Sequence, residues 1–342
     1  MRPALILSLA KKNGVDIPAE DEAGVRKWLR FRDFPHFLEV YQTVCKCLKE
    51  PEDFHCLALD FLAEQAIQNI RWSEVHFTIA THVLHGRNAD EVRQALHEAV
   101  RDGEKRHGIR MRLIPDIVRG YGPELADVTL EWALAGHREG LVSALGLSGD
   151  ESQPHESYLE HFAAARKAEL PVVAHVGEHR PPDEMRRVLD DVAPERIDHG
   201  IQAVGDDSLL ADLVEKQTPL TVCPTSNVVL GAVPSMGEHP FRPLAEAGAN
   251  VSVNCDDSQL FSTNLTREYV HLHAAFGYSA QQLADFARAG IRQAFLEDGE
   301  RAELEGLLVQ RAAELGQRYL GEAVHLENAI LESAIQEDTE DG

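Results

Sequence analysis

The stretch PVVAHVGEHRPPDEMRRVLDDV (171–192) contains the repeating unit that decides the fold of this chain. Its first six residues are apolar except for one histidine, which is typical of a buried parallel strand. A polar turn with His175 and Glu178 follows, and Pro181 and Pro182 then open a segment with helical periodicity. The apolar face of that helix is formed by Met185, Val188, Leu189 and Val192. The stretch therefore predicts a strand, a turn that carries polar groups, and a helix.

The same unit recurs along the chain. Most of the predicted strands are followed by an amphipathic helix, so we expect a parallel α/β sheet with right-handed crossovers. Two architectures fit this pattern, a (β/α)8 TIM-type barrel and an open doubly wound sheet. The barrel is favoured because no glycine-rich phosphate-binding loop follows any strand. The six further strands are predicted at 72–78, 109–118, 141–148, 196–201, 219–224 and 249–255.

The start of the chain does not match a complete barrel. A barrel needs eight strands, whereas this sequence opens with a predicted helix at 3–11 that Asn13 and Gly14 end. We therefore expect the first barrel strand to precede Met1, with extra helices after it. We also expect one barrel domain over residues 1–330 and an acidic, disordered tail over 331–342.

Composition excludes several classes of partner. A net charge of −24 over 342 residues repels phosphate backbones, so nucleic acid is not an expected partner. No apolar run reaches the roughly 20 residues that a membrane-spanning helix needs, so no membrane partner is expected. Five cysteines without a C-x-x-C pair argue against a thiolate zinc site and favour a reducing compartment. We expect a cytoplasmic protein, and the sequence leaves its oligomeric state open.

Polar residues collect at the carboxyl ends of five consecutive predicted strands. In a barrel these ends meet at one rim, where active sites lie. A packing role alone would require apolar residues there, so the pattern predicts a functional site at the rim. The groups are Ser148 to Glu151, His175 with Glu178 and His179, Asp198 with His199, the CPTSN run (223–227), and Asp256 with Asp257.

Imidazole and carboxylate groups suggest metal chemistry at this rim. They are the usual protein ligands of zinc, and His175 and Asp256 are the best placed. Zinc lowers the pKa of bound water to about 7 and so makes a hydroxide available at neutral pH. Glu178 and His199 would then orient that hydroxide and supply a proton to the leaving side.

Several short motifs resemble those of one known family. HVGE (175–178), RIDHG (196–200), CPTSN (223–227) and VNCDD (253–257), in this order and on successive strands, resemble the adenosine deaminase family of metal-dependent barrel hydrolases. SGDE (148–151) adds a fifth match. The resemblance implies hydrolytic deamination of a 6-aminopurine with one zinc ion, and a small-molecule purine as the partner.

The resemblance also implies roles for individual residues. His175 and Asp256 would ligate zinc. Glu178 would protonate the purine ring nitrogen, and His199 would orient the zinc-bound water and help deprotonate it. Asp257 would hydrogen-bond the purine, and the backbone N–H of Gly149 would contact the purine's other edge.

One family feature falls outside the sequence. Family members begin with a strand ending in His-x-His, which supplies two further zinc ligands and would lie before Met1. HLH at 271–273 has this spacing but lies in a predicted helix, which points the two side chains to different faces. Either the start was assigned to an internal methionine, or the product lacks the strand and two ligands, and activity is then impaired. The first explanation is favoured because the other motifs are all present.

Two motifs of the sequence point to different substrates. Asp198 in RIDHG is common in adenine-type members, whereas SGDE resembles the nucleoside-type members. Adenosine or a related nucleoside is the main expectation, and adenine or aminodeoxyfutalosine is the alternative. A non-catalytic purine-binding protein is the alternative from another class.

Overall fold

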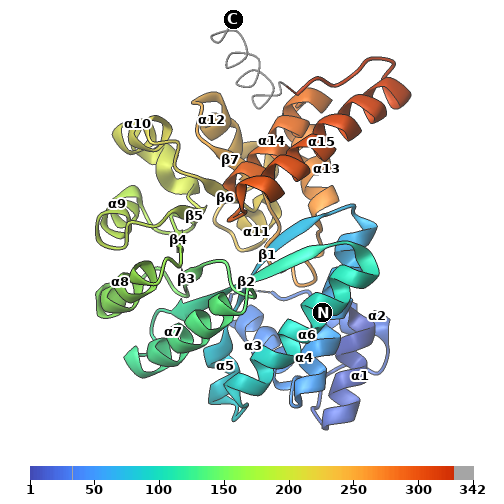
Figure 1. Cartoon of the computed structure of the whole chain (residues 1–342), viewed down its shortest axis with the longest axis vertical. Helices are drawn as coiled ribbons and strands as arrows, with labels where there is room; N and C mark the ends of the chain where they lie inside the picture. Colours follow the sequence, from blue (N-terminus) through green and yellow to red (C-terminus); the bar gives the residue numbers. More distant parts are fainter. Residues whose placement is uncertain (33, 327–342) are drawn as a thin grey trace, which may run out of the picture.

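The computed structural model describes residues 1–32 and 34–326, and within them seven parallel strands form one sheet in the order β1 to β7 (Figure 1). All seven predicted strands are confirmed, although several are shorter than expected. The region 141–148, for example, contributes only one bridge, from Val142 to Leu113, before its strand begins at Leu145. The strands are β1 Trp72–Phe77, β2 Arg110–Val118, β3 Leu145–Ser148, β4 Val172–Val176, β5 Arg196–His199, β6 Leu220–Val222 and β7 Val251–Val253.

Helices surround the strands and precede them (Figure 1). Before β1 lie α1 Pro3–Asn13, α2 Glu22–Trp28, α3 Phe34–Lys46 and α4 Pro51–Ile67. Between β1 and β4 lie α5 Ile79–Leu84, α6 Ala89–His107, α7 Pro123–Arg138, η1 Glu156–Tyr158 and α8 Leu159–Lys167. Between β4 and β7 lie α9 Pro182–Asp191, η2 Ile201–Gly205, α10 Asp207–Glu215, α11 Pro224–Val229, η3 Met236–Glu238 and α12 Phe241–Glu246. After β7 follow α13 Leu265–Phe276, which contains HLH 271–273 as predicted, α14 Ala280–Gln293 and α15 Asp298–Tyr319.

Contacts across the interior show that the sheet curls into a barrel-like form. In a flat sheet, β1 and β5 would be separated by four strand spacings, roughly 19 Å. Instead, Arg196 Nη1 of β5 lies 2.6 Å from Glu74 Oε2 of β1. The strand order also runs without the reversal that marks a doubly wound sheet. The barrel prediction is therefore confirmed, and the open doubly wound alternative is wrong.

The barrel interior changes from apolar to polar along the strands. Ile114 of β2 and Val173 of β4 form a small buried cluster with Ala144, the residue just before β3. Two residues further along these strands, on the same face of the sheet, stand Asp116 and His175. The polar layer therefore lies directly above the apolar one, toward the carboxyl ends of the strands.

The structure leaves the predicted domain bounds, the predicted tail and the predicted first strand untested. The main hydrophobic cluster includes residues from Leu9 to Tyr278, which pack around the outside of the sheet. The 331–342 tail lies outside the described residues, and the single domain over 1–330 and the strand before Met1 stay predictions. In the part of the chain that is described, no helix is both long and apolar enough to cross a membrane.

Candidate active site and metal centre

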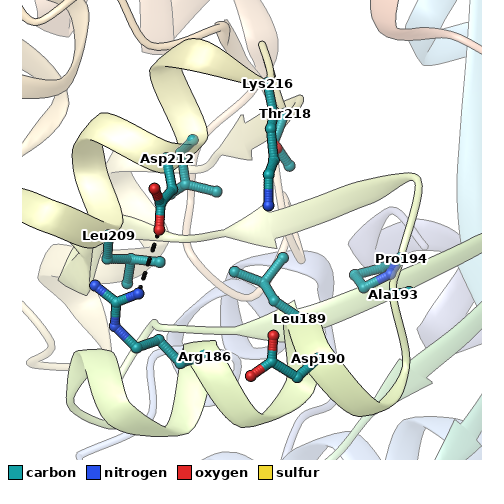
Figure 2. Close-up of a pocket in the computed structure, with 10 residues that line it drawn as sticks. Arg186, Leu189, Asp190, Ala193, Pro194, Leu209, Asp212, Lys216 and Thr218 are labelled. Carbon is teal, nitrogen blue, oxygen red and sulfur yellow. Dashed lines mark hydrogen bonds and ion pairs between the residues drawn. The ribbon is translucent and has the colours of Figure 1, made fainter.

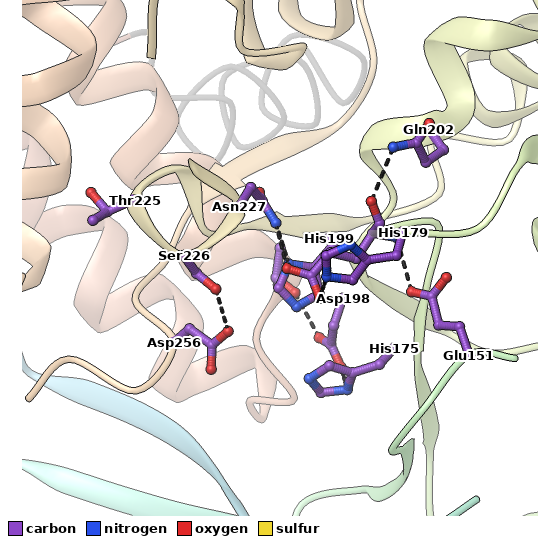
Figure 3. Close-up of polar contacts among 12 residues, drawn as sticks. Glu151, His175, His179, Asp198, His199, Gln202, Thr225, Ser226, Asn227 and Asp256 are labelled. Carbon is purple, nitrogen blue, oxygen red and sulfur yellow. Dashed lines mark hydrogen bonds and ion pairs between the residues drawn. The ribbon is translucent and has the colours of Figure 1, made fainter. Parts of the chain in front are cut away.

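Three side chains from three strands converge in the polar layer of the barrel. Asp198 Oδ2 of β5 lies 3.1 Å from His175 Nδ1 of β4 and 3.2 Å from His76 Nε2 of β1. One ligand atom from each of the three residues falls within 4.8 Å of the others, a spacing suited to a metal ion. Figure 3 shows His175 and Asp198 side by side at the strand ends. Asp198 is fixed by a 2.6 Å hydrogen bond from Thr221 Oγ1 to its Oδ1.

The electrostatics of this cluster favour a bound cation. Burial works against a charged imidazole, but Asp116 and Asp198 outweigh it and raise the pKa of His76 well above its usual value. Burial likewise opposes a charge on His175, and Asp198 raises its pKa. With neutral imidazoles, the two aspartates would place two negative charges in a buried space. The cluster is therefore suited to positive charge, whether protons or a divalent ion.

The loop after β4 is held in a tight turn that positions Glu178. Gly177 has φ +73°, and a Cβ there would lie 2.3 Å from Met185 Sδ, so only glycine fits. The backbone N–H of Glu178 donates to Glu151 Oε1 at 2.9 Å, and its carbonyl accepts from Gln202 Nε2 at 3.0 Å (Figure 3). The backbone of Glu178 is thus fixed from both sides.

Asn227 of α11 links the two predicted acid–base residues. The backbone N–H of Phe241 donates to His239 Nδ1 at 2.9 Å, so His239 carries its proton on Nε2 when neutral. That Nε2 lies 3.1 Å from Asn227 Oδ1. The Asn227 amide is therefore oriented to donate to Glu178 Oε1 at 2.8 Å and to His199 Nδ1 at 3.1 Å. This leaves Nε2 as the N–H of a neutral His199.

The backbone at His199 is strained. Its φ is +68°, a conformation that non-glycine residues seldom adopt, and the residue is 2% exposed. Its ring centroid lies 5.3 Å from that of His175. Strain of this kind costs on the order of 1–3 kcal/mol and is found most often at functional sites.

Asp256 and Asp257 follow β7, and the Asp256 carboxylate accepts two hydrogen bonds. Asp256 Oδ2 accepts a 2.7 Å hydrogen bond from Ser226 Oγ, and its Oδ1 accepts one of 2.9 Å from the Asp257 N–H. Burial, with the Asp256 carboxylate as the next cause, raises the pKa of Asp257 to about 7. Gly149 lies directly after β3 with φ +89°. The predicted roles of Asp256 as ligand and of Asp257 and Gly149 as purine contacts stay predictions.

An aromatic group packs against the loop that carries Asp257. The rings of Phe31, Phe37 and Phe261 have centroids 5.2 to 5.8 Å apart. The Phe261 N–H donates to the carbonyl of Asp257 at 2.9 Å, which ties this group to the rim. An apolar surface therefore stands next to one of the predicted purine contacts.

Sequence reasoning missed three residues of this site. His76 lies in a strand that reads as ordinary, Asn227 was part of a motif without an assigned role, and Glu151 was not expected to bind the loop of Glu178. The signal for His76 was the alternation of side chains along the strand, because Glu74 and His76 share one face of β1, whereas Val75 and Phe77 lie on the other. Polar residues on the inward face of a barrel strand indicate a site in the interior.

A cavity of about 240 Å³ lies between α9 and α10 on the outer ring (Figure 2). None of the residues predicted to act at the rim lines it. Two of its polar lining residues form an ion pair, with Arg186 Nη1 3.4 Å from Asp212 Oδ2. The lining residues are Arg186, Leu189, Asp190, Ala193, Pro194, Leu209, Asp212, Leu213, Lys216 and Thr218.

Comparisons with known proteins agree with this architecture. The adenine deaminase of Albidiferax ferrireducens is 35% identical over 298 residues, which covers 87% of this chain and 86% of that protein. The structure of adenine deaminase from Arthrobacter aurescens matches with a TM-score of 0.85 and 30% identity, over 91% of this chain and 94% of that one. An amidohydrolase from Burkhoderia ambifaria, solved with bound Zn, has the same fold, with a TM-score of 0.85, 24% identity, and coverage of 94% and 90%.

A family model shows the relationship over most of the length. The model described as adenosine deaminase matches residues 1–310, the region that contains the whole sheet and every rim motif. The chain therefore belongs to the adenosine deaminase family and is a hydrolase that acts on carbon–nitrogen bonds.

Proposed function

We propose that this chain hydrolytically deaminates a 6-aminopurine, and that its substrate is free adenine. The observation that carries the proposal is the name shared by its relatives, since proteins 35% and 30% identical over about nine tenths of the chain are adenine deaminases. These findings favour adenine, the alternative in the sequence analysis, over adenosine, the main expectation. The Asp198 signal in RIDHG points the same way.

The proposed reaction adds water to the amino-bearing carbon and releases ammonia, giving the 6-oxopurine. Glu178 would donate a proton to the ring nitrogen as the carbon is attacked. Its carboxylate is held by Asn227, whose amide donates to Oε1 at 2.8 Å. His199 would orient the attacking water through its Nε2–H, because its Nδ1 is occupied by the same amide.

The purine would lie between the rim and the aromatic group. Asp257 would hydrogen-bond one ring edge, and its pKa of about 7 allows it to do so with a proton near neutral pH. The Gly149 N–H would contact another edge. The rings of Phe37 and Phe261, 5.8 Å apart and near parallel at 21°, would provide an apolar wall for the heterocycle.

The rim residues fit the metal ion that this chemistry calls for. Buried imidazoles and carboxylates are a zinc donor set, and Asp198 Oδ2 is buried without a hydrogen bond of normal geometry in the described residues. A divalent ion bound among them would supply a water of lowered pKa.

Turnover of a substrate panel tests the proposal. The zinc-supplemented chain is incubated with adenine, adenosine and aminodeoxyfutalosine, and loss of the adenine absorbance is measured together with ammonia release. We expect turnover of adenine above the other two, and a loss of at least about 100-fold in Glu178→Gln. Glu160→Gln, at a surface position on α8, is the matched control. Thermal stabilisation by adenine without ammonia release would instead identify a purine-binding protein.

A further inference from the structure

We propose that Glu268 of α13 is a positioning residue for the acid–base step, because it holds the short helix from which Asn227 reaches Glu178. The inference rests on the proposed function, in which Glu178 donates a proton to the purine. Glu268 belongs to none of the rim motifs and takes no part in the proposed reaction, yet it is 1% exposed. Burying a carboxylate is costly unless its oxygens are hydrogen-bonded, so the partners of these oxygens identify what Glu268 holds.

One oxygen of Glu268 holds the start of α11. Glu268 Oε2 accepts a hydrogen bond of 3.0 Å from the backbone N–H of Thr225. Thr225 is the second residue of α11, and the first N–H groups of a helix have no partner within that helix. Cys223, the residue before α11, supplies no side-chain hydrogen bond to them. The acceptor for Thr225 therefore comes from another helix, 43 residues further along the chain.

A second contact from α13 holds the side chain of Thr225. His271 lies three residues after Glu268, so the two side chains share one face of α13. Its Nδ1 lies 3.1 Å from Thr225 Oγ1. The backbone and the side chain of Thr225 are therefore both bound to the same face of α13.

The position of Thr225 determines the position of Asn227. Two residues after Thr225, the Asn227 amide donates to Glu178 Oε1 at 2.8 Å and to His199 Nδ1 at 3.1 Å. Figure 3 shows Asn227 directed at His199, with Thr225 on the far side of the same short helix. A shift of Thr225 would therefore also shift the amide that contacts Glu178.

The other oxygen of Glu268 holds the loop that follows β7. Glu268 Oε1 accepts a hydrogen bond from the hydroxyl of Thr263. The backbone N–H of Thr263 donates to the carbonyl of Ser258 at 2.9 Å, which closes the loop between these two residues. One carboxylate therefore joins two loops at the rim. A side chain shorter by one methylene would move the carboxylate by about 1.5 Å and could not keep both contacts.

The contacts of Glu268 depend on the length of its side chain rather than on its charge. Both donors are neutral groups, a backbone N–H and a hydroxyl. In Glu268→Gln, the amide oxygen can accept from the Thr225 N–H, and the amide nitrogen can donate to Thr263 Oγ1, because a hydroxyl also accepts. The positioning role therefore predicts that glutamine can replace Glu268 and that aspartate cannot. A role for the negative charge predicts the reverse.

Adenine turnover by two variants of the 342-residue chain tests the inference. Glu268→Asp should lower kcat about 10- to 100-fold and change KM by less than about 3-fold, since a misplacement of about 1 Å can cost this much. Glu268→Gln should keep kcat within about 3-fold of the wild type. Glu305→Asp is the matched control, because Glu305 is 5% exposed and its Oε1 accepts from Arg292 Nε at 2.6 Å, between α14 and α15. Equal kcat values for Glu268→Asp and Glu305→Asp overturn the inference, and so does an equal loss in Glu268→Gln and Glu268→Asp.

A double variant tests whether Glu268 acts through Asn227. In the Asn227→Asp background, Glu268→Asp should lower kcat by less than about 3-fold, because the contact that Glu268 positions is already lost. If the losses of the two single variants multiply instead, Glu268 acts elsewhere and the inference is overturned. Should Glu268→Asp fail to fold, Thr263→Val removes one donor to the carboxylate and should lower kcat about 3- to 10-fold, and an unchanged kcat then overturns the inference.

Crystal structures of the variants give a readout that needs no turnover. Glu268→Asp should move the Asn227 amide away from Glu178 by at least about 1 Å, whereas Glu305→Asp should leave it in place. An unmoved amide in Glu268→Asp overturns the inference. If the wild type deaminates no purine, the proposed function fails, and a displaced amide still supports the positioning contact.

Discussion

Replacing Asn227 with aspartate should remove the hydrogen bond that Asn227 donates to Glu178, while the side chain at position 227 keeps its shape. Asn227 is 0% exposed, and its amide nitrogen donates to Glu178 Oε1 at 2.8 Å. Asn227→Asp exchanges that donor for a carboxylate oxygen. Glu178 then loses a hydrogen bond to its ionised form and gains a neighbouring negative charge, so the change should act on the acid–base step rather than on purine binding.

The size of the effect follows from the lost contact. A hydrogen bond to a charged group contributes about 1.5–3 kcal/mol. At 1.36 kcal/mol per pH unit, the limb of the pH profile that this carboxyl controls should move up by about 1–2 units. If the same free energy is lost from the transition state, kcat for adenine falls about 10- to 150-fold, and KM changes less.

Asn13 offers a matched control away from the residues predicted to act at the rim. Its amide donates to Asp53 Oδ2 at 2.7 Å, and Asp53 is 0% exposed, so Asn13→Asp makes the same chemical change between α1 and α4. Both variants should lose about 1.5–3 kcal/mol of unfolding free energy in urea. Only Asn227→Asp should move the pH profile. If its profile and kcat match those of Asn13→Asp, the positioning role of Asn227 is refuted.

Three further changes have expected outcomes. Gly146→Ala should displace Asp116 and cost about 1–3 kcal/mol of stability, because a Cβ at residue 146 would lie 2.0 Å from Asp116 Oδ1. Gly306→Ala, where a Cβ meets nothing within 4 Å, should not have this cost, and equal urea midpoints for the two variants would contradict the prediction. Burial, followed by the influence of a neighbouring imidazole, lowers the pKa of His239 to about 4. The unfolded chain therefore binds this proton first, and stability is complete above pH 6.5 and falls by up to about 3 kcal/mol toward pH 4. His239→Gln should remove that part of the fall in urea titrations run from pH 7 to pH 4, and an unchanged slope would count against it. Glu151→Gln should leave one backbone N–H unpaired, cost about 1–3 kcal/mol and lower kcat, which denaturation and ammonia assays would measure.

The fold was predictable from the sequence because its signals are local. In the repeating unit at 171–192, a short apolar run marks the strand and periodic apolar residues mark the helix that follows it. The rim residues were predictable for the same reason, because the carboxyl end of each predicted strand can be located in the sequence. The substrate was not predictable in this way, because SGDE and RIDHG resemble different members of the family. Adenosine was therefore the main expectation from the sequence, and adenine was the alternative.

The contacts inside the barrel were not predictable, because they depend on how far the sheet curls. His76 and Asp198 are 122 residues apart and four strands apart, and only the curvature of the barrel brings Nε2 and Oδ2 to 3.2 Å. In β1 the alternation of Trp72, Glu74 and His76 shows which residues share a face, but not what that face meets. Glu74 and Arg196, one layer lower, are brought together by the same curvature and form an ion pair at 2.6 Å. A polar residue on an inward strand face is therefore evidence for an interior site, and its partners follow only once the barrel has been built.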